Sequence, residues 1–230
     1  MPAATERNPL QLMRLLQLAS PALPVGAYSY SQGLERAVET GTVCDERSAT
    51  AWIDDALTLV VARFEGPLLL RMLAAAAQNK ADELYALNAL FLASRETAEL
   101  RAETVQMGRS LGRLLGELDQ TRASAAVLAP LEEPAFPCAW ACAAAAFGLA
   151  HAEAYAAYLW SWTENQVMAA IKLVPLGQSA GQRMLAQLAA RISSIATDAG
   201  SAAVHLANFA PGLAIASSMH ETQYTRLFRS

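Results

Sequence analysis

Cysteine and charge are both scarce in this chain of 230 residues, and each scarcity excludes a class of protein. Cys44, Cys138 and Cys142 are an odd number of cysteines in a chain long enough to bury a core without cross-links, which excludes a disulfide scaffold. A reducing, cytoplasmic location is therefore expected. Charged residues make up only 17% of the chain, and the net charge is −4. Because neutralising phosphates requires clustered Lys or Arg, nucleic-acid binding is not expected.

Motifs for catalysis and nucleotide binding are also missing. The sequence has no GxxxxGK(S/T) phosphate loop, no GxGxxG and no HExxH, and the serines between Gly26 and Gly33 do not fit GxSxG. We therefore expect a protein that performs no chemistry of its own and needs no cofactor.

Metal ligands are few and scattered. Cys138 and Cys142 lie four residues apart, on one face of an expected helix, but small buried side chains explain this pair better than a zinc or nickel site does. The alternative is a metal-dependent hydrolase whose ligands are His151, His205, His220 and the cysteines. The sparse ligands argue against it, and we expect no metal site.

Long apolar runs of the membrane type are absent as well. Residues 134–150 and 199–219 lack Asp, Glu, Lys and Arg, but they are rich in small residues and would insert weakly. Gln11, Arg14 and Gln17 interrupt the leucine-rich run near the N-terminus, which argues against a signal peptide. A peripheral membrane protein is a third alternative, but the weak basic character of the chain opposes it. No membrane partner is expected.

Hydrophobic residues are abundant by contrast, at 54% of the chain. This is more apolar surface than a monomer usually hides, so we expect buried interfaces with partners. Apolar residues recur at helical spacing almost throughout, and no linker divides the chain. The sequence predicts one all-α domain over residues 1–230, a bundle of about eight to ten helices with a flexible N-terminus over about residues 1–8.

Start and stop signals set the expected helices. Asn8 followed by Pro9 predicts a helix start, Asp45 is a candidate cap, and Gly66 with Pro67 should bend or restart the chain. Residues 119–137 hold three prolines and are expected to form a loop. The expected helices cover residues 9–19, a segment ending at 41, 45–64, 68–79, 82–93, 95–118, 138–149, 151–174 and 178–199.

The most informative stretch is residues 15–35, LLQLASPALPVGAYSYSQGLE, where a helical run breaks into a loop rich in aromatic and hydroxyl groups. Gly26 can adopt a positive φ, and Tyr28 and Tyr30 then offer a recognition surface. The alternative is a plain helix-to-helix turn in which Ser29 or Ser31 caps the next helix.

Two further segments carry polar or aromatic groups in unexpected places. Asn165 and Lys172 lie seven residues apart, and hence on one face of the aromatic helix, where Lys172 either faces a partner or compensates the helix dipole. Near the C-terminus, Tyr224, Leu227 and Phe228 alternate with arginines, a composition typical of interface hot spots. We expect the segment over about residues 212–230 to bind a partner and to become ordered on binding.

Three motifs together resemble those of the urease accessory protein UreF family. They are the loop of residues 15–35, the segment WSWTENQVMAAIKLVPLGQ at 160–178, and the closing HETQYTRLFRS at 220–230. The resemblance implies an all-α, non-catalytic homodimer that bridges UreD, also called UreH, and the GTPase UreG, regulates that GTPase, and helps to insert nickel into the urease apoprotein. One departure concerns Ala135, which stands before Phe136 and Pro137 where family members often have His, and it argues against metal handling there.

The motif residues that the resemblance assigns to partner binding lie in three groups. They are Pro24, Gly26, Tyr28, Ser29, Tyr30, Gln32 and Glu35 in the first motif, Glu164, Asn165, Lys172, Pro175, Gly177 and Gln178 in the second, and His220, Glu221, Tyr224, Arg226, Leu227, Phe228 and Arg229 in the third.

Overall fold

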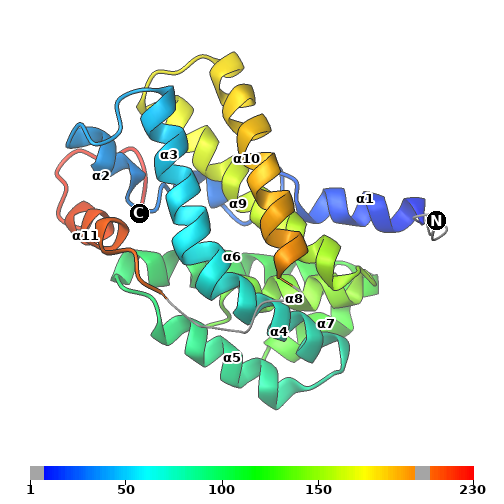
Figure 1. The fold of residues 1–230 in the computed structure, drawn as a ribbon. Coiled ribbons are helices and arrows are strands. Elements are labelled where there is room, and N and C mark those ends of the chain that lie inside the picture. Colours follow the sequence, from blue (N-terminus) through cyan, green and yellow to red (C-terminus); the bar gives the residue numbers. More distant parts are fainter. Residues whose placement is uncertain (1–7, 200–207) are drawn as a thin grey trace.

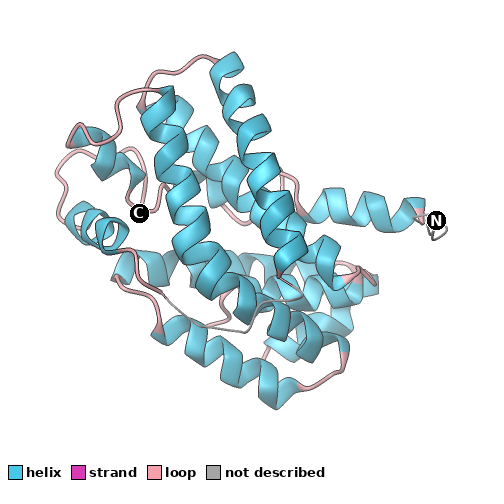
Figure 2. Ribbon diagram, in the orientation of Figure 1, coloured by secondary structure: helices cyan, strands magenta, loops and turns pink. Residues whose placement is uncertain are grey.

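The structure, a computed structural model, describes residues 8–199 and 208–230, and these contain helices and loops but no strand (Figure 2). The expected all-α class is confirmed. The α-helices are α1 (Pro9–Leu18), α2 (Leu34–Glu39), α3 (Glu46–Ala56), α4 (Gly66–Ala77), α5 (Ala81–Ala93), α6 (Ala98–Glu117), α7 (Arg122–Leu128), α8 (Phe136–Ala146), α9 (His151–Leu173), α10 (Gln178–Asp198) and α11 (Pro211–His220). Short 3₁₀ turns η1 (Ala27–Ser29) and η3 (Asp119–Thr121) and a π-helical segment η2 (Leu57–Glu65) join them. Residues 1–7, expected to be flexible, and His205 lie outside the described residues.

Local cap signals set two helix starts as predicted. The Asn8 side chain accepts a hydrogen bond from the Leu10 N–H at 3.0 Å, one residue into α1. Asp45 caps α3 by accepting from the Ser48 N–H at 2.7 Å, while the Ser48 hydroxyl approaches the Asp45 N–H in return. Both caps satisfy N–H groups that a helix start leaves without partners.

The loop predicted for residues 119–137 is partly wrong, because it contains η3 and α7. The prolines of this region lie after α7 and do not interrupt it. The glycine face of α6 brings α7 close: Leu128 Cδ1 lies 3.5 Å from the position that a Cβ on Gly112 would take. Tertiary packing, rather than local sequence, therefore supports this short helix.

Helix α8 is the centre of the molecule, as its small side chains predicted. Every residue from Phe136 to Ala144 is buried. Trp140 donates its indole N–H to the Ala154 carbonyl at 3.1 Å, and its ring meets those of Phe136 and Tyr158 edge-on. We call this packed centre, which also takes in α4, α5, α6 and the first half of α9, the main core.

A second core forms where α2, α3, α9 and α10 meet, with Leu34, Ile53, Val167 and Leu188 buried in it. Phe228, from the other end of the chain, belongs to it too. Accordingly α2, α11 and the C-terminal end lie together on one side in Figure 1, whereas α1 projects from the opposite side. Among the described residues, no helix combines the length and the hydrophobicity needed to cross a membrane.

Candidate partner-binding surface

The first motif forms a tight loop, residues 24–33, which we call the tyrosine loop. Gly26 has φ 78°, as expected from the sequence, and Gln32 also lies in the left-handed region at φ 52°. The two tyrosines then point different ways: the side chain of Tyr28 is exposed, whereas Tyr30 is buried in the main core. Pro24 is exposed at the start of the loop. The loop therefore offers one aromatic side chain to solvent and uses the other to hold its place.

Neither serine of the loop occupies the N-cap position of α2, which belongs to Gly33. Ser31 instead links three segments. Its hydroxyl donates to the Ser230 main-chain oxygen at 2.5 Å and accepts from the Glu35 N–H at 3.3 Å. The plain-turn alternative therefore does not describe this loop, because the hydroxyl serves a segment distant in sequence.

The last residues of the chain, 221–230, which we call the tail, are docked along the tyrosine loop. The Arg229 N–H donates to the Ser29 carbonyl at 2.9 Å, and the Ser31 N–H donates to the Ser230 oxygen at 2.8 Å. The tail is therefore ordered within the chain itself, contrary to the expectation that it orders only on a partner.

Glu35 of α2 is the main anchor of the tail. Its two carboxylate oxygens accept from the N–H groups of Leu227 at 2.6 Å and Phe228 at 2.9 Å, and the Nε2 of His220 lies 3.1 Å away. The carboxylate is almost fully buried. A buried charge needs such partners, because removing it from water is unfavourable unless hydrogen bonds replace the hydration shell.

His220 at the end of α11 is fully buried between two carboxylates. Its Nδ1 lies 2.7 Å from Glu99 of α6, which is also bound by Arg226 of the tail. Because carboxylates accept hydrogen bonds, a ring nitrogen of His220 that carries a proton has an acceptor on either side. Glu221 completes the junction by accepting from the Glu99 N–H at 3.2 Å. This polar cluster joins α2, α6, α11 and the tail.

The end of α9 reaches the tail through Lys172. Its ammonium group lies 5.6 Å from the centre of the Phe228 ring, a distance typical of a cation–π contact, and it stays exposed. Pro175, Gly177 and Gln178 form the exposed turn into α10, where Pro175 has φ 20°. The structure therefore brings the second motif next to the third.

Asn165 and Glu164 lie about two turns before Lys172 on α9. The Asn165 side chain donates to the Tyr30 carbonyl at 3.2 Å, which gives this amide the partner that its burial requires. Partial burial raises the pKa of the Glu164 carboxyl. All three motifs thus meet at the tyrosine loop.

Glu103 of α6 belongs to this surface, although none of the three sequence motifs contains it. It is buried, and it accepts from Gln32 at 2.7 Å and from the Ser230 hydroxyl at 2.8 Å. Gln32 in turn accepts from the Trp162 indole N–H at 2.9 Å. Burial raises the pKa of the Glu103 carboxyl from 4.5 to about 7, against the lowering effect of the two hydrogen bonds. Its position three residues after buried Leu100 was the available signal.

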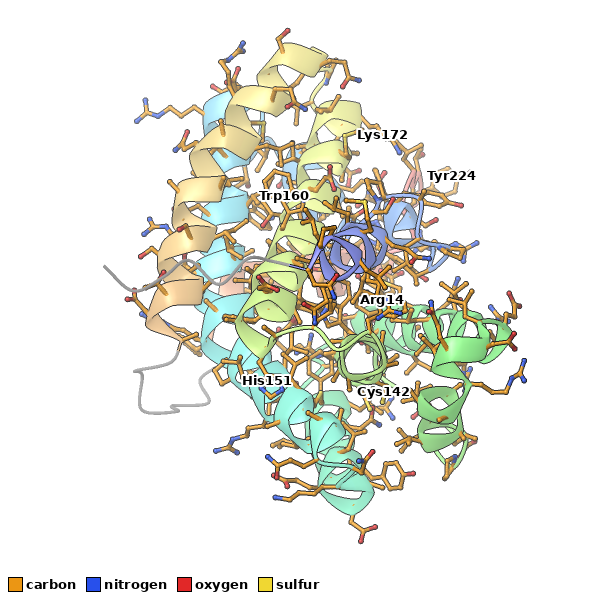
Figure 3. All side chains as sticks on the ribbon, turned by 90° about the vertical axis from the view of Figure 1, so that its right-hand side faces the viewer. Arg14, Cys142, His151, Trp160, Lys172 and Tyr224 are labelled. Carbon is orange, nitrogen blue, oxygen red and sulfur yellow. The ribbon has the colours of Figure 1, made fainter. Side chains whose placement is uncertain are left out.

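Exposed apolar side chains surround the docked tail. Tyr224 is fully exposed and Leu227 is 65% exposed, and Ile215 and Met219 of α11 also face solvent. Figure 3 places Lys172 and Tyr224 toward the same end of the molecule, away from Cys142 and His151. Large apolar side chains exposed on two consecutive segments of the chain are typical of an interaction site.

The candidate metal ligands do not converge. Cys138 and Cys142 are buried in α8, Cys44 is exposed before α3, and His220 is engaged with Glu35 and Glu99. Within residues 8–199 and 208–230, no three His, Cys, Asp or Glu side chains are arranged to hold a metal ion. His205 falls outside those ranges.

Comparisons with known proteins agree with the motifs. The UreF family model matches residues 43–189. The urease accessory protein UreF of Azoarcus sp. is 60% identical over 225 residues, covering 96% of each chain. That of Dechloromonas aromatica is 55% identical over 224 residues, covering 96% of this chain and 98% of the relative. A bifunctional urease accessory protein UreEF of Bordetella bronchiseptica is 50% identical over 225 residues, covering 96% of this chain and 52% of its own.

Proposed function

The chain belongs to the UreF family of urease accessory proteins, so its role lies in urease maturation, and we propose that it acts there as an adaptor. In this proposal it forms a homodimer, bridges UreD (also called UreH) and the GTPase UreG, and supports GTP-dependent nickel insertion into the urease apoprotein. The GTPase carries out the hydrolysis, and this chain positions and regulates it.

The observation that carries the proposal is the surface built by the docked tail. Glu35 and the tyrosine loop hold the main chain of residues 227–230, so that Tyr224 and Leu227 project into solvent while Phe228 is buried. Large apolar side chains on a fixed backbone bind with little loss of entropy. We propose Tyr28, Tyr224 and Leu227 as direct partner contacts, with Lys172, Arg226 and Arg229 at their edge.

The remaining motif residues fall into two roles in this proposal. Those that are buried or hydrogen-bonded inside the surface shape it without touching the partner: Tyr30, Gln32, Glu35, Asn165, His220 and Phe228. Those in the loop, on α9, in the α9–α10 turn and at the end of α11 extend it: Pro24, Gly26, Ser29, Glu164, Pro175, Gly177, Gln178 and Glu221.

Two observations support further partners. Helix α1 exposes Leu10, Met13 and Leu16, each at 54–55%, beside an open apolar groove of about 1000 Å³ lined by α1, α9 and α10. This surface is suited to the proposed homodimer. The relative named as bifunctional UreEF supports the proposal that this chain works beside another maturation protein.

Co-expression with a UreD-type protein tests the proposal. We expect the wild-type chain to capture that partner and Tyr224→Ser and Leu227→Ser to lose capture while keeping their helical circular dichroism. Leu90→Ser is the matched control, because Leu90 of α5 is also exposed, at 42%, but lies away from the tail. Retention of the partner by both tail variants would contradict the proposed surface.

A further inference from the structure

Glu103 joins three parts of the chain through one buried carboxylate. It belongs to α6, and its two oxygens accept from Gln32 of the tyrosine loop at 2.7 Å and from Ser230 of the tail at 2.8 Å. Gln32 and Ser230 are separated by almost the whole sequence. The protonation state of this carboxyl therefore bears directly on the contact between loop and tail.

Among the residues that the structure describes, no Lys, Arg or His forms an ion pair with Glu103. It lines a cavity of about 50 Å³ together with Glu65 and Arg95, but Arg95 is paired with Glu65 at 2.6 Å and both of these side chains are buried. The other ionisable groups that face this site are Tyr30 of the tyrosine loop, Tyr158 of α9 and Arg229 of the tail. Ionised Glu103 is thus a buried charge whose two hydrogen bonds come from neutral donors, while Arg95 acts on it without an ion pair.

We propose that Glu103 is a proton-linked latch for the tail: its neutral carboxyl group holds residues 221–230 on the tyrosine loop, and its ionised form favours their release. A neutral carboxyl group can donate to the Ser230 hydroxyl and still accept from Gln32, so it satisfies both contacts without a buried charge. The carboxylate gains its hydration shell only when the tail leaves and water enters.

The sign and size of the effect follow from linkage. The pKa of Glu103 is about 7 with the tail docked, and it falls toward 4.5 when the group is hydrated, so release gives up a proton and is favoured as pH rises. With these two pKa values, the equilibrium constant for release increases about tenfold between pH 6 and pH 8. The tail is held most firmly below pH 4.5, and the equilibrium constant for release rises with pH until it levels off above pH 7.

A role for this latch in partner binding rests on the proposed function, because the tail forms the surface proposed to meet the partner. The latch itself is a property of the chain alone. The latch is measured on the chain without any partner present. A failure of the latch can therefore be distinguished from a failure of the proposed partner binding.

Hydrogen exchange of the purified chain tests the latch. The exchange of the peptide covering residues 221–230 is measured by mass spectrometry at pH 6 and pH 8, with exchange times scaled for the intrinsic pH dependence of amide exchange. We expect the wild-type tail to lose protection about tenfold between these values. Peptides of α4, which is buried in the main core, should keep the same protection at both pH values.

Two variants separate Glu103 from its neighbours. Glu103→Gln keeps an acceptor for Gln32 and a donor for Ser230 but cannot ionise, so its tail protection should be the same at both pH values. Glu99→Gln, one turn earlier on α6, weakens the contacts to His220 and Arg226 and should loosen the tail at both values, with the tenfold change intact. A wild-type tail with no pH dependence would overturn the proposal. A pH-dependent change that survives in Glu103→Gln would overturn it too, because that change would belong to a group other than Glu103.

Discussion

Glu35→Ala is the substitution that tests most directly how the tail is anchored. It removes the acceptor of the Leu227 and Phe228 N–H groups and one of the two carboxylates around His220. Hydrogen bonds to a charged acceptor contribute about 1.5 to 3 kcal/mol each, but a released tail can bind water instead. We therefore expect the free energy of unfolding to fall by about 2 to 4 kcal/mol, less than the sum of the three contacts.

Urea denaturation followed by circular dichroism measures that loss, and exchange of the peptide over residues 221–230 reports whether the tail has left. Capture of a UreD-type partner should be lost in parallel, because the proposed surface needs the docked tail. The Glu35→Gln variant, which retains one acceptor oxygen, should lie between the wild-type chain and Glu35→Ala in all three assays.

Glu39→Ala is the matched control. Glu39 is on the same helix, one turn further on, and its ion pair with Arg36 at 2.6 Å is half exposed. Exposed pairs of this kind contribute at most about 1 kcal/mol. If both alanine variants unfold at the same urea concentration and keep a protected tail, Glu35 is no more important than a surface carboxylate and does not anchor the tail.

Three further predictions follow from local features of the structure. Gly26→Val should disturb the tyrosine loop and reduce urease activation, since φ 78° costs a non-glycine residue about 1 to 2 kcal/mol; Gly212→Val, also in open space but without positive φ, should behave as wild type. Lys172→Ala should lower urease activation while the melting temperature changes by only a few degrees, and Lys172→Arg should restore activation because it keeps the cation. The isolated chain should bind nickel only weakly in calorimetry, and a tight, stoichiometric site that disappears in Cys138→Ala or Cys142→Ala would contradict this.

Much of the helical framework was predictable because its signals are local. Asn8 and Asp45 cap helices through hydrogen bonds that span two or three residues, so their side chains alone indicate where α1 and α3 begin. Gly26 can likewise adopt a positive φ because glycine has no Cβ, a property of the residue itself. The π-helical segment η2 and the short helix α7 were not predicted, because both depend on what packs against them.

The three motifs of the candidate surface can be recognised in the sequence, but the contacts between them cannot. The three motifs named Glu35, His220 and Phe228 as partner contacts, yet these side chains are buried and connect the motifs to one another. A carboxylate is expected to be exposed when only its neighbours in the sequence are known. The hydrogen-bond partners of Glu35 lie 185 to 193 residues further along the chain. Sequence patterns with a period of two to four residues carry no information over that distance.

The same distance explains why substitutions in different motifs should give one phenotype. Loss of the Glu35 carboxylate, of the Ser31 hydroxyl or of the tail itself breaks contacts of one kind, because each of these bonds joins the first motif to the third. Effects of such variants on tail protection should be strongly non-additive, since residues in one hydrogen-bonded network share their interaction energy. A Glu35→Ala, Ser31→Ala double variant that loosens the tail no more than Glu35→Ala alone would identify the loop and the tail as one unit, whereas additive losses would mean that each motif binds its partner separately.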